Sequence, residues 1–299
     1  MPKHVVSLGV IPFVETEYLP HVISTLSAST VAGYKKLWRA YRRYVEPSTL
    51  EMRPCEAQNI LRSIALNNPH LGSRSLSHTK ALFSGIWSFA VCMGVVDSNP
   101  WRMVKLPKAH EPGETTAYSP GEVAAMMKAL PPPYDLLILF FACSGCRKSE
   151  VRGAQWGDFS DCYTTLSIAR AVWGTVIKDT KTRASRANIP IVPELATRLA
   201  ALRGKAAAGA FVFHNRDGRS LDLDNACRRI IVPALKKAGI SWSGFHGFRR
   251  GLATILHSRS VPDKEIQRIL RHSDLATTMR CYVKALPEST RAAMAALHF

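Results

Sequence analysis

Apolar residues in the first third of the chain recur at spacings of three and four, which is the period of amphipathic helices. The clearest run follows an N-cap at Ser29 or Thr30, and its apolar face consists of Val31, Tyr34, Trp38, Tyr41 and Val45. Similar patterns predict helices over residues 55–66, with Pro54 near the first turn, and over residues 76–92. We therefore expect this part of the chain to be helical.

A stretch without periodicity, residues 106–118, separates this part from the rest of the chain. It contains two prolines, a glycine and charges of both signs, so it is the best candidate for a linker. Directly after it, Ser119 and Glu122 form a capping-box signature. Helices are predicted from there through about residue 130 and over residues 134–143.

The period then changes to that of strands. Residues 164–170, 171–177 and 187–192 are short β-branched runs divided by polar turns, which predicts a small antiparallel meander. From residue 193 the pattern is helical again, with an interruption at Asp217 and Gly218. The sequence thus predicts a mainly α fold with a small antiparallel β-sheet, arranged as a helical domain at residues 1–105 (ordered from about residue 20), a linker at 106–118 and an α+β domain at 119–299.

The balance of charge indicates the kind of partner. The chain has 40 Lys and Arg residues against 22 Asp and Glu, a net charge of +18, and such an excess favours nucleic acid over an acidic membrane surface or a merely solvated basic face.

No apolar run approaches the ~18–20 residues of a membrane span. Seven scattered cysteines indicate reduced thiols and a cytoplasmic protein. The isolated C-x-x-C spacing of Cys143 and Cys146 is not expected to bind zinc.

Basic residues gather where they could contact DNA phosphates. On the polar face of the first predicted helix, five cations precede the first acidic residue, Glu46, so they lack partners at i,i+4 spacing. Others lie in a turn between two predicted strands and in the helix at residues 76–92. The predicted DNA-contacting residues are Lys35, Lys36, Arg39, Arg42, Arg43, Lys80, Arg183 and Arg186.

Seven further residues are candidates for chemistry: Tyr282, Arg147, Lys181, His246, Arg249, His272 and Glu150. Each has an ordinary explanation by itself, as a surface ion pair, a solvated turn or a packing residue. Together they supply guanidiniums, an ammonium, imidazoles and a phenol, which suit the charge that develops on phosphate oxygens during phosphoryl transfer. Acidic pairs with metal-ligand spacing are not apparent, which favours covalent over metal-assisted cleavage.

These residues, in this order, resemble the tyrosine recombinase, or phage integrase, family over nearly the whole chain. The matching segments are residues 142–159 with Arg147 and Glu150, residues 180–191 with Lys181, the H-x-x-R box from His246 to Arg249, and residues 270–282 with His272 and Tyr282. Residues 76–101, which include Asn-Pro-Trp, resemble the end of the family's helical core-binding domain. The first 20 or so residues are too few for an arm-type domain, so the resemblance implies the compact two-domain form.

The resemblance implies a site-specific DNA recombinase that needs no cofactor, metal or ATP. Tyr282 would form a 3′-phosphotyrosyl intermediate and free a 5′-hydroxyl. The other implied roles are phosphate oxygen binding by Arg147 and Arg249, protonation of the leaving 5′ oxygen by Lys181, acceptance of the tyrosine proton by His246, phosphate binding by His272 and orientation of neighbours by Glu150.

The implied partners are double-stranded DNA with inverted-repeat sites, three further copies of the chain on paired sites, and a directionality factor. A bacterial, phage or mobile-element origin fits this reading. Two alternatives remain open: a type IB-like topoisomerase or telomere resolvase, and a non-catalytic DNA-binding regulator on the same scaffold.

Three positions depart from the family pattern, and one assignment has a competitor. Arg271 stands where members usually have glycine, which suits a left-handed helix end. Arg250 replaces a common histidine, and Cys146 replaces an aliphatic residue. Lys178 competes with Lys181 as the general acid.

The last residues of the chain provide a first prediction. Ala292, Met294, Leu297 and Phe299 form an apolar tail with few partners of its own, and in this family such a tail docks on a neighbouring protomer. Deleting residues 292–299 should therefore weaken synapsis on paired DNA sites, measured by native gel shift. Unchanged synapsis and cleavage would contradict tail exchange.

Overall fold

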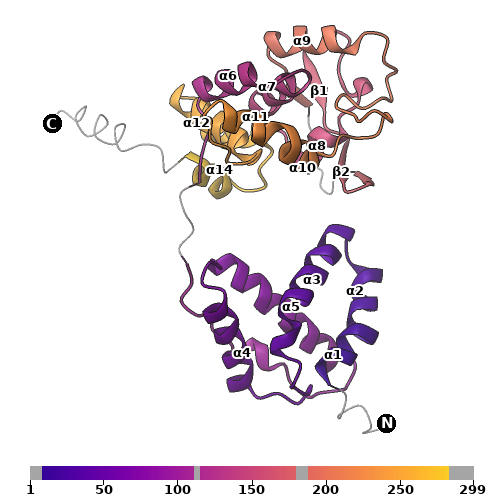
Figure 1. Ribbon diagram of the computed structural model, residues 1–299, viewed down its shortest axis with the longest axis vertical. Coiled ribbons are helices and arrows are strands. Elements are labelled where there is room, and N and C mark those ends of the chain that lie inside the picture. Colours follow the sequence, from indigo (N-terminus) through magenta and orange to yellow (C-terminus); the bar gives the residue numbers. More distant parts are fainter. Residues whose placement is uncertain (1–8, 111–114, 180–187, 283–299) are drawn as a thin grey trace, which may run out of the picture. The chain divides into compact units, whose positions relative to one another are not determined.

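The computed structural model describes residues 9–110, 115–179 and 188–282 (Figure 1). The chain divides into two compact units, Met1–Glu114 and Thr115–Phe299, each with its own buried core. The described part is mainly helical with small antiparallel sheets, so the predicted fold class is confirmed. The finer division at residues 105 and 119 stays a prediction.

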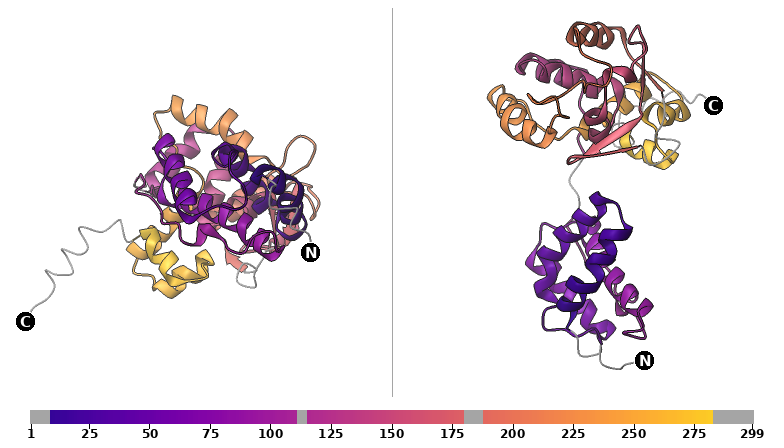
Figure 2. Two further views of the ribbon diagram at one scale, coloured as in Figure 1. Left: turned by 90° about the horizontal axis from the view of Figure 1, so that it is seen from below. Right: turned by 90° about the vertical axis from the view of Figure 1, so that its right-hand side faces the viewer.

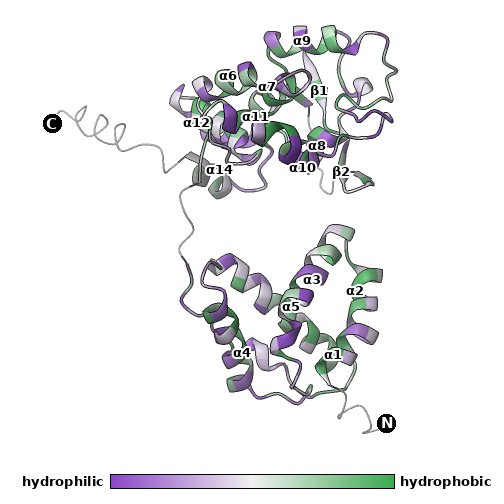
Figure 3. Ribbon diagram, in the orientation of Figure 1, coloured by the Kyte–Doolittle hydropathy of each residue, from purple (hydrophilic) through white to green (hydrophobic). Residues whose placement is uncertain are grey.

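The N-terminal unit is built from five α-helices among its described residues, and their colours in Figure 3 alternate between hydrophobic and hydrophilic as amphipathic helices require. Helical structure begins at Val10. Pro12 lies in the first turn, where a missing N–H is tolerated, and Pro20 directly follows the π-helical turn. The elements are α1 (Val10–Phe13), a π-helical turn (Val14–Tyr18), α2 (Leu19–Thr25), α3 (Ala28–Tyr41), α4 (Pro54–Asn67), α5 (Ser73–Cys92) and 3₁₀ turns at Arg42–Tyr44 and Pro100–Arg102.

Two tryptophans are central to this unit's core. Trp87 and Trp101 are fully buried, and the Trp87 indole donates a hydrogen bond of 2.9 Å to the carbonyl of Leu50. Asn99 caps the turn that carries Trp101: its carbonyl oxygen accepts from the Trp101 backbone N–H at 3.0 Å, and its amide donates to the Ser84 carbonyl at 2.8 Å. The Asn-Pro-Trp sequence therefore fixes the chain leaving α5 against the core.

In the C-terminal unit, seen from two further sides in Figure 2, the hydrophobic helix α7 contributes the consecutive buried residues 136–141 to the core. Its elements are α6 (Pro120–Ala129), α7 (Tyr134–Ser144), α8 (Lys148–Gly153), β1 (Thr165–Ser167), β2 (Arg170–Trp173), β3 (Val176–Asp179), β4 (Asn188–Pro190), α9 (Pro193–Arg203), α10 (Leu223–Ala226), a π-helical turn (Cys227–Ile231), α11 (Val232–Lys237), α12 (His246–Ser258), α13 (Asp263–Leu270) and α14 (Leu275–Tyr282).

The strands do not form the single meander predicted from the sequence. β1 pairs with β4 and β2 pairs with β3, both antiparallel, in two separate two-stranded sheets. Residues 171–177, expected to be one strand, fold back on themselves because Gly174 adopts a left-handed φ of 59° in the turn. The alternation of β-branched residues indicated strands correctly, but not where the turn would fall.

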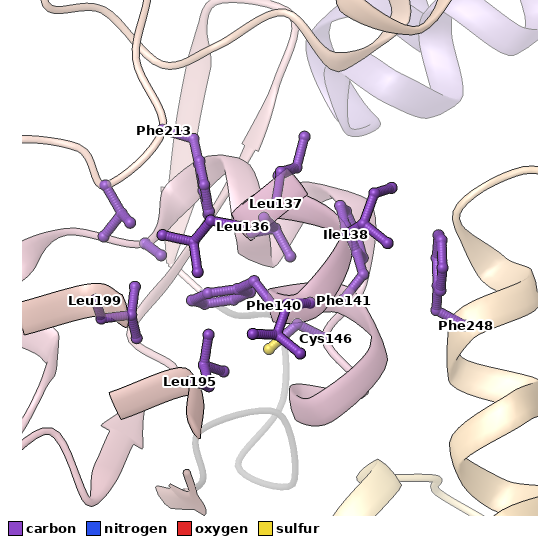
Figure 4. Packing of buried hydrophobic residues seen from close by; sticks show 14 of the residues in the cluster. Leu136, Leu137, Ile138, Phe140, Phe141, Cys146, Leu195, Leu199, Phe213 and Phe248 are labelled. Atoms are coloured by element: carbon purple, nitrogen blue, oxygen red, sulfur yellow. The ribbon is translucent and has the colours of Figure 1, made fainter. Parts of the chain in front are cut away.

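Helix α12 is held on the core by close packing on two sides. Phe248 lies near Phe141 of α7, with ring centroids 6.1 Å apart (Figure 4). On another face, Tyr118 lies so close that a Cβ at Gly247 would meet its ring at 2.6 Å, and a Cβ at Gly251 would meet its carbonyl oxygen at 2.2 Å. The two glycines of the sequence HGFRRG are therefore required for this approach.

Candidate active site

Arg147 and Glu150 lie at the tight connection between α7 and α8. Gly145 ends α7 in a left-handed conformation with a φ of 58°, and Arg147 is the N-cap residue of α8. The Glu150 carboxylate accepts the Arg147 backbone N–H at 2.7 Å and its Nη1 at 2.8 Å. Glu150 therefore fixes both the backbone and the side chain of Arg147, which is 40% exposed.

A second arginine reaches the same carboxylate. The Arg271 Nη2 atom lies 2.6 Å from Glu150 Oε2, and the two side chains are only 1% and 4% exposed. Burial by itself raises the pKa of Glu150, but the positive charges of Arg271 and Arg147 and the backbone hydrogen bond outweigh it and lower that pKa. Glu150 is therefore an ionised carboxylate shared by two guanidiniums.

Arg249 is buried in the first turns of α12, with 2% of its surface exposed. It donates Nη1 to the carbonyl of Gly145 at 2.5 Å, Nη2 to the carbonyl of Leu270, and Nε to the ring of His272 at 3.2 Å. Burial and the neighbouring Arg147 and Arg271 lower the pKa of Arg249 to about 9, so it stays protonated at neutral pH. A guanidinium has five N–H donors, and these contacts use three of them.

His272 follows Arg271 and is held from both sides of its ring. Because Arg249 can only donate, Nε2 of His272 accepts, and Nδ1 then carries the proton and donates to Thr278 Oγ1 at 2.8 Å. Burial, together with the charges of Arg249 and Arg147, lowers the pKa of His272 to about 4. The imidazole is neutral at pH 7, and both ring nitrogens are engaged within the protein.

His246 begins α12 and is accessible to solvent. Partial desolvation and then the charges of Arg250, Arg249 and Arg147 lower its pKa. A neutral imidazole can accept a proton, so His246 is suited to the role of a base rather than an acid at neutral pH.

The other predicted catalytic residues are placed only in part. Tyr282 is the last residue of α14, a helix that packs against α12 and α13, but its side chain lies outside the described part of the structure. Lys181, Arg183 and Arg186 also lie outside the described residues. Lys178 belongs to β3, and its side chain is likewise not described. Their roles stay predictions.

The predicted DNA-contacting residues of the N-terminal unit gather on α3 and the turn that follows it, apart from Lys80 on α5. The sequence showed no acidic partner at i,i+4 spacing for these cations before Glu46. Arg42, in the turn after α3, nevertheless forms an ion pair of 2.9 Å with Glu15 from the π-helical turn before α2. Lys80 donates to the carbonyl of Val104 at 2.5 Å. Lys36, Arg39 and Arg43 are exposed and remain candidates for phosphate contact.

The described residues contain neither a metal-ligand cluster nor a membrane-spanning helix. No group of three or more His, Cys, Asp or Glu side chains in ranges 9–110, 115–179 and 188–282 is placed to hold a metal ion. Within the same ranges, every helix is too short or too polar to cross a bilayer.

Sequence reasoning missed two contacts that complete the site. Thr278, which is fully buried, orients His272. The only sequence feature that could have indicated this contact is the spacing of six residues between them. Arg271 was noted as a departure from glycine, and it indeed has a left-handed φ of 56°. Its ion pair with Glu150 joins positions 121 residues apart, so no local pattern in the sequence indicates it.

Comparison with known proteins identifies the family. The model of the phage integrase family matches residues 119–289, which is more than half of the chain. The chain belongs to the phage integrase family. A tyrosine recombinase XerC-like protein of Caldanaerobacter subterraneus is 25% identical over 308 residues, covering 89% of this chain and 78% of that protein. An integrase of Streptomyces ambofaciens is 26% identical over 260 residues, covering 79% and 66%.

Solved structures have the same fold. A Tn1549 transposon integrase in complex with a circular intermediate DNA superposes with a TM-score of 0.77 at 17% identity, covering 98% of this chain and all of that one. A lambda integrase dimer bound to a COC′ core site gives 0.71 at 16% identity, covering 93% and 78%. The family member described here is thus a DNA strand-transferase of the tyrosine recombinase type, an enzyme of site-specific recombination, and the topoisomerase, resolvase and regulator readings are not favoured.

The charges around His246 predict a pH dependence. If His246 accepts the tyrosine proton, cleavage is lost as pH falls through its lowered pKa, because the protonated ring can no longer accept. Arg250 is the first of the charges that lower this pKa, so Arg250→Gln should raise it and move the acid limb of the cleavage profile to higher pH. Arg250→Lys keeps the charge and serves as the control. Identical acid limbs for the two variants would contradict the prediction.

The contact between Thr278 and His272 predicts a loss of rate. Thr278→Val keeps the side-chain shape but leaves the Nδ1–H of His272 without its acceptor, at a cost of about 1–3 kcal/mol. Cleavage by the variant should slow by about 10-fold or more, in single-turnover assays at saturating DNA. Thr197→Val, on the exposed face of α9, should leave the rate unchanged; an equal rate for Thr278→Val and wild type would show that this hydrogen bond does not matter.

Proposed function

We propose that Tyr282 attacks the scissile phosphate of one DNA strand while Arg147 and Arg249 bind its non-bridging oxygens. The bond from the tyrosine oxygen to phosphorus forms as the bond to the 5′ oxygen breaks, which leaves a 3′-phosphotyrosyl link and a 5′-hydroxyl. His246 accepts the phenol proton, and Lys181 donates a proton to the leaving oxygen. Because the covalent link replaces one phosphate ester by another, a new 5′-hydroxyl can reverse the step without ATP.

The observation that carries this proposal is the convergence of Arg147, Arg249 and His272. These residues come from three segments far apart in sequence. Arg147 donates to the carbonyl of Arg271. Arg249 donates to the carbonyl of Gly145 and to the ring of His272. The planar fork of a guanidinium can bind a pair of phosphate oxygens. Helix α14, which packs on both α12 and α13, ends at the tyrosine. Removing one such donor typically costs about 10²–10³ in rate.

The geometry supports a different role for His272 from the one predicted. Binding a phosphate oxygen requires an N–H donor, but the Nδ1–H group is directed to Thr278 and Nε2 accepts from Arg249. We therefore assign to His272 the positioning of Arg249, with Thr278 fixing the ring. Glu150 positions Arg147 in the same way.

The remaining parts of the proposal concern assembly. Lambda integrase has been solved as a dimer on a core site and as a tetramer on a Holliday junction, and the charge of +18 favours a DNA partner. We propose that this chain likewise acts as a homotetramer on paired inverted-repeat sites. Exchange of the tail at residues 289–299, which lies outside the described residues, stays a prediction. A directionality factor and a cytoplasmic location also stay predictions.

A suicide substrate tests the chemistry. Duplexes tiled across the DNA that borders the gene are nicked next to each candidate phosphate, so that the cleaved fragment diffuses away and the covalent complex is trapped. The wild-type protein should form an adduct that survives denaturing electrophoresis, and Tyr282→Phe should form none while still shifting the DNA on native gels. Tyr134→Phe, at the start of α7, is the matched control and should behave as wild type.

Two outcomes would overturn this function. Adducts of equal yield from wild type and Tyr282→Phe would exclude Tyr282 as the nucleophile. Rapid relaxation of a supercoiled plasmid that lacks the recombination site would indicate a topoisomerase instead, because site-specific cleavage should be slow on such DNA.

A further inference from the structure

Arg271 occupies a position that is costly for an arginine in two respects. It ends α13 with φ 56° and ψ 46°, a left-handed conformation that glycine adopts without penalty. Its side chain is also almost fully buried, where an arginine must lose its hydration. The ion pair with Glu150 offsets part of this cost, so the buried guanidinium of Arg271 depends on Glu150.

The two oxygens of Glu150 are divided between two arginines. Oε2 accepts from Nη2 of Arg271 at 2.6 Å and from the backbone N–H of Arg147 at 2.7 Å. The side chain of Arg147 reaches only Oε1, through Nη1 at 2.8 Å. Its other terminal nitrogen, Nη2, donates to the backbone carbonyl of Arg271 at 3.1 Å. Arg271 thus contacts this pair with both its side chain and its backbone.

This division determines how the Arg147 guanidinium is turned. An arginine and a carboxylate alone readily form a fork with two parallel hydrogen bonds. That fork would direct both terminal nitrogens of Arg147 at Glu150. With Oε2 occupied, Nη2 is directed instead toward the end of α13, next to the segment that carries His272.

The charges of Arg147, Arg249, Arg271 and Glu150 sum to a net positive cluster. Arg147, Arg249 and Arg271 bring three positive charges, and Glu150 is the negative charge that contacts two of them. Nε and Nη1 of Arg271 have no hydrogen-bond partner among the described residues. The guanidinium is therefore held by its charge and by one short contact, and the cluster keeps a net positive charge for an anionic ligand.

We infer that Arg271 is a positioning residue for Arg147: by occupying one oxygen of Glu150 and offering its own carbonyl, it prevents a closed Arg147–Glu150 fork and keeps Arg147 turned toward the phosphate site. The inference rests on the proposed function, in which Arg147 binds the scissile phosphate. It assigns a role to a side chain at a position where glycine would fit the backbone better.

The experiment is a double-mutant cycle on the full-length protein with the nicked DNA substrate. Arg271→Gly suits the left-handed backbone and removes only the side chain. We expect it to slow single-turnover cleavage at saturating DNA by about 10- to 100-fold, while the Kd for DNA changes by less than about threefold. Arg268→Ala, an exposed arginine of the same helix, should cleave as wild type.

Coupling to Glu150 distinguishes positioning from a general structural effect. If Arg271 acts through Glu150, the double variant Arg271→Gly with Glu150→Gln should be no slower than the slower single variant. Rate losses that multiply in the double variant would overturn the inference, and so would an Arg271→Gly protein that cleaves as fast as wild type.

Two controls separate a failure of the inferred role of Arg271 from a folding defect and from a failure of the proposed function. If Arg271→Gly does not fold by circular dichroism, Arg271→Asn, which is uncharged and tolerates the left-handed backbone, replaces it in the cycle with the same criteria. If the wild-type protein itself forms no adduct on this substrate, the proposed function fails; if wild type forms the adduct and Arg271→Gly matches its rate, only the role of Arg271 fails.

Discussion

The buried guanidinium of Arg249 holds together the ends of two helices in the C-terminal unit, α7 and α13. The last carbonyls of a helix lack intrahelical donors and carry partial negative charge. Arg249 donates to the carbonyl of Gly145 after α7 and to that of Leu270 at the end of α13. Because both helix ends are fixed by the same group, the residues that follow them, Arg147 and His272, are brought to one place.

Burial and the excess of positive charge in this cluster together explain the state of its histidines. Desolvation and then the neighbouring guanidiniums lower the pKa of both His246 and His272. A neutral His246 can accept a proton, and a neutral His272 can accept a hydrogen bond from Arg249. In the proposed mechanism, the charges that would bind the phosphate therefore also help to keep the two imidazoles neutral.

Much of the fold could be predicted from local patterns. The periodicity around Trp38 predicted α3, the capping box of Ser119 and Glu122 predicted the start of α6, and β-branched runs indicated the strands. The pairing of β1 with β4 could not be predicted in this way, because hydrogen bonding between strands depends on where the chain returns. The ion pair of Arg42 with Glu15 could not be predicted either, because the acid comes from another helical segment, 27 residues away.

The sequence by itself determined the helical class, the basic character and, through the order of its motifs, the family and the identity of the candidate catalytic residues. Only the tertiary structure decided how those residues contact one another. Sequence spacing specifies neighbours within one helix, as for Arg147 and Glu150, whereas the contacts of Arg249 and Arg271 join the ends of separate elements. Such contacts form because buried charges and helix-end carbonyls must find partners inside the folded chain, and which partners they find depends on the packing of the whole unit.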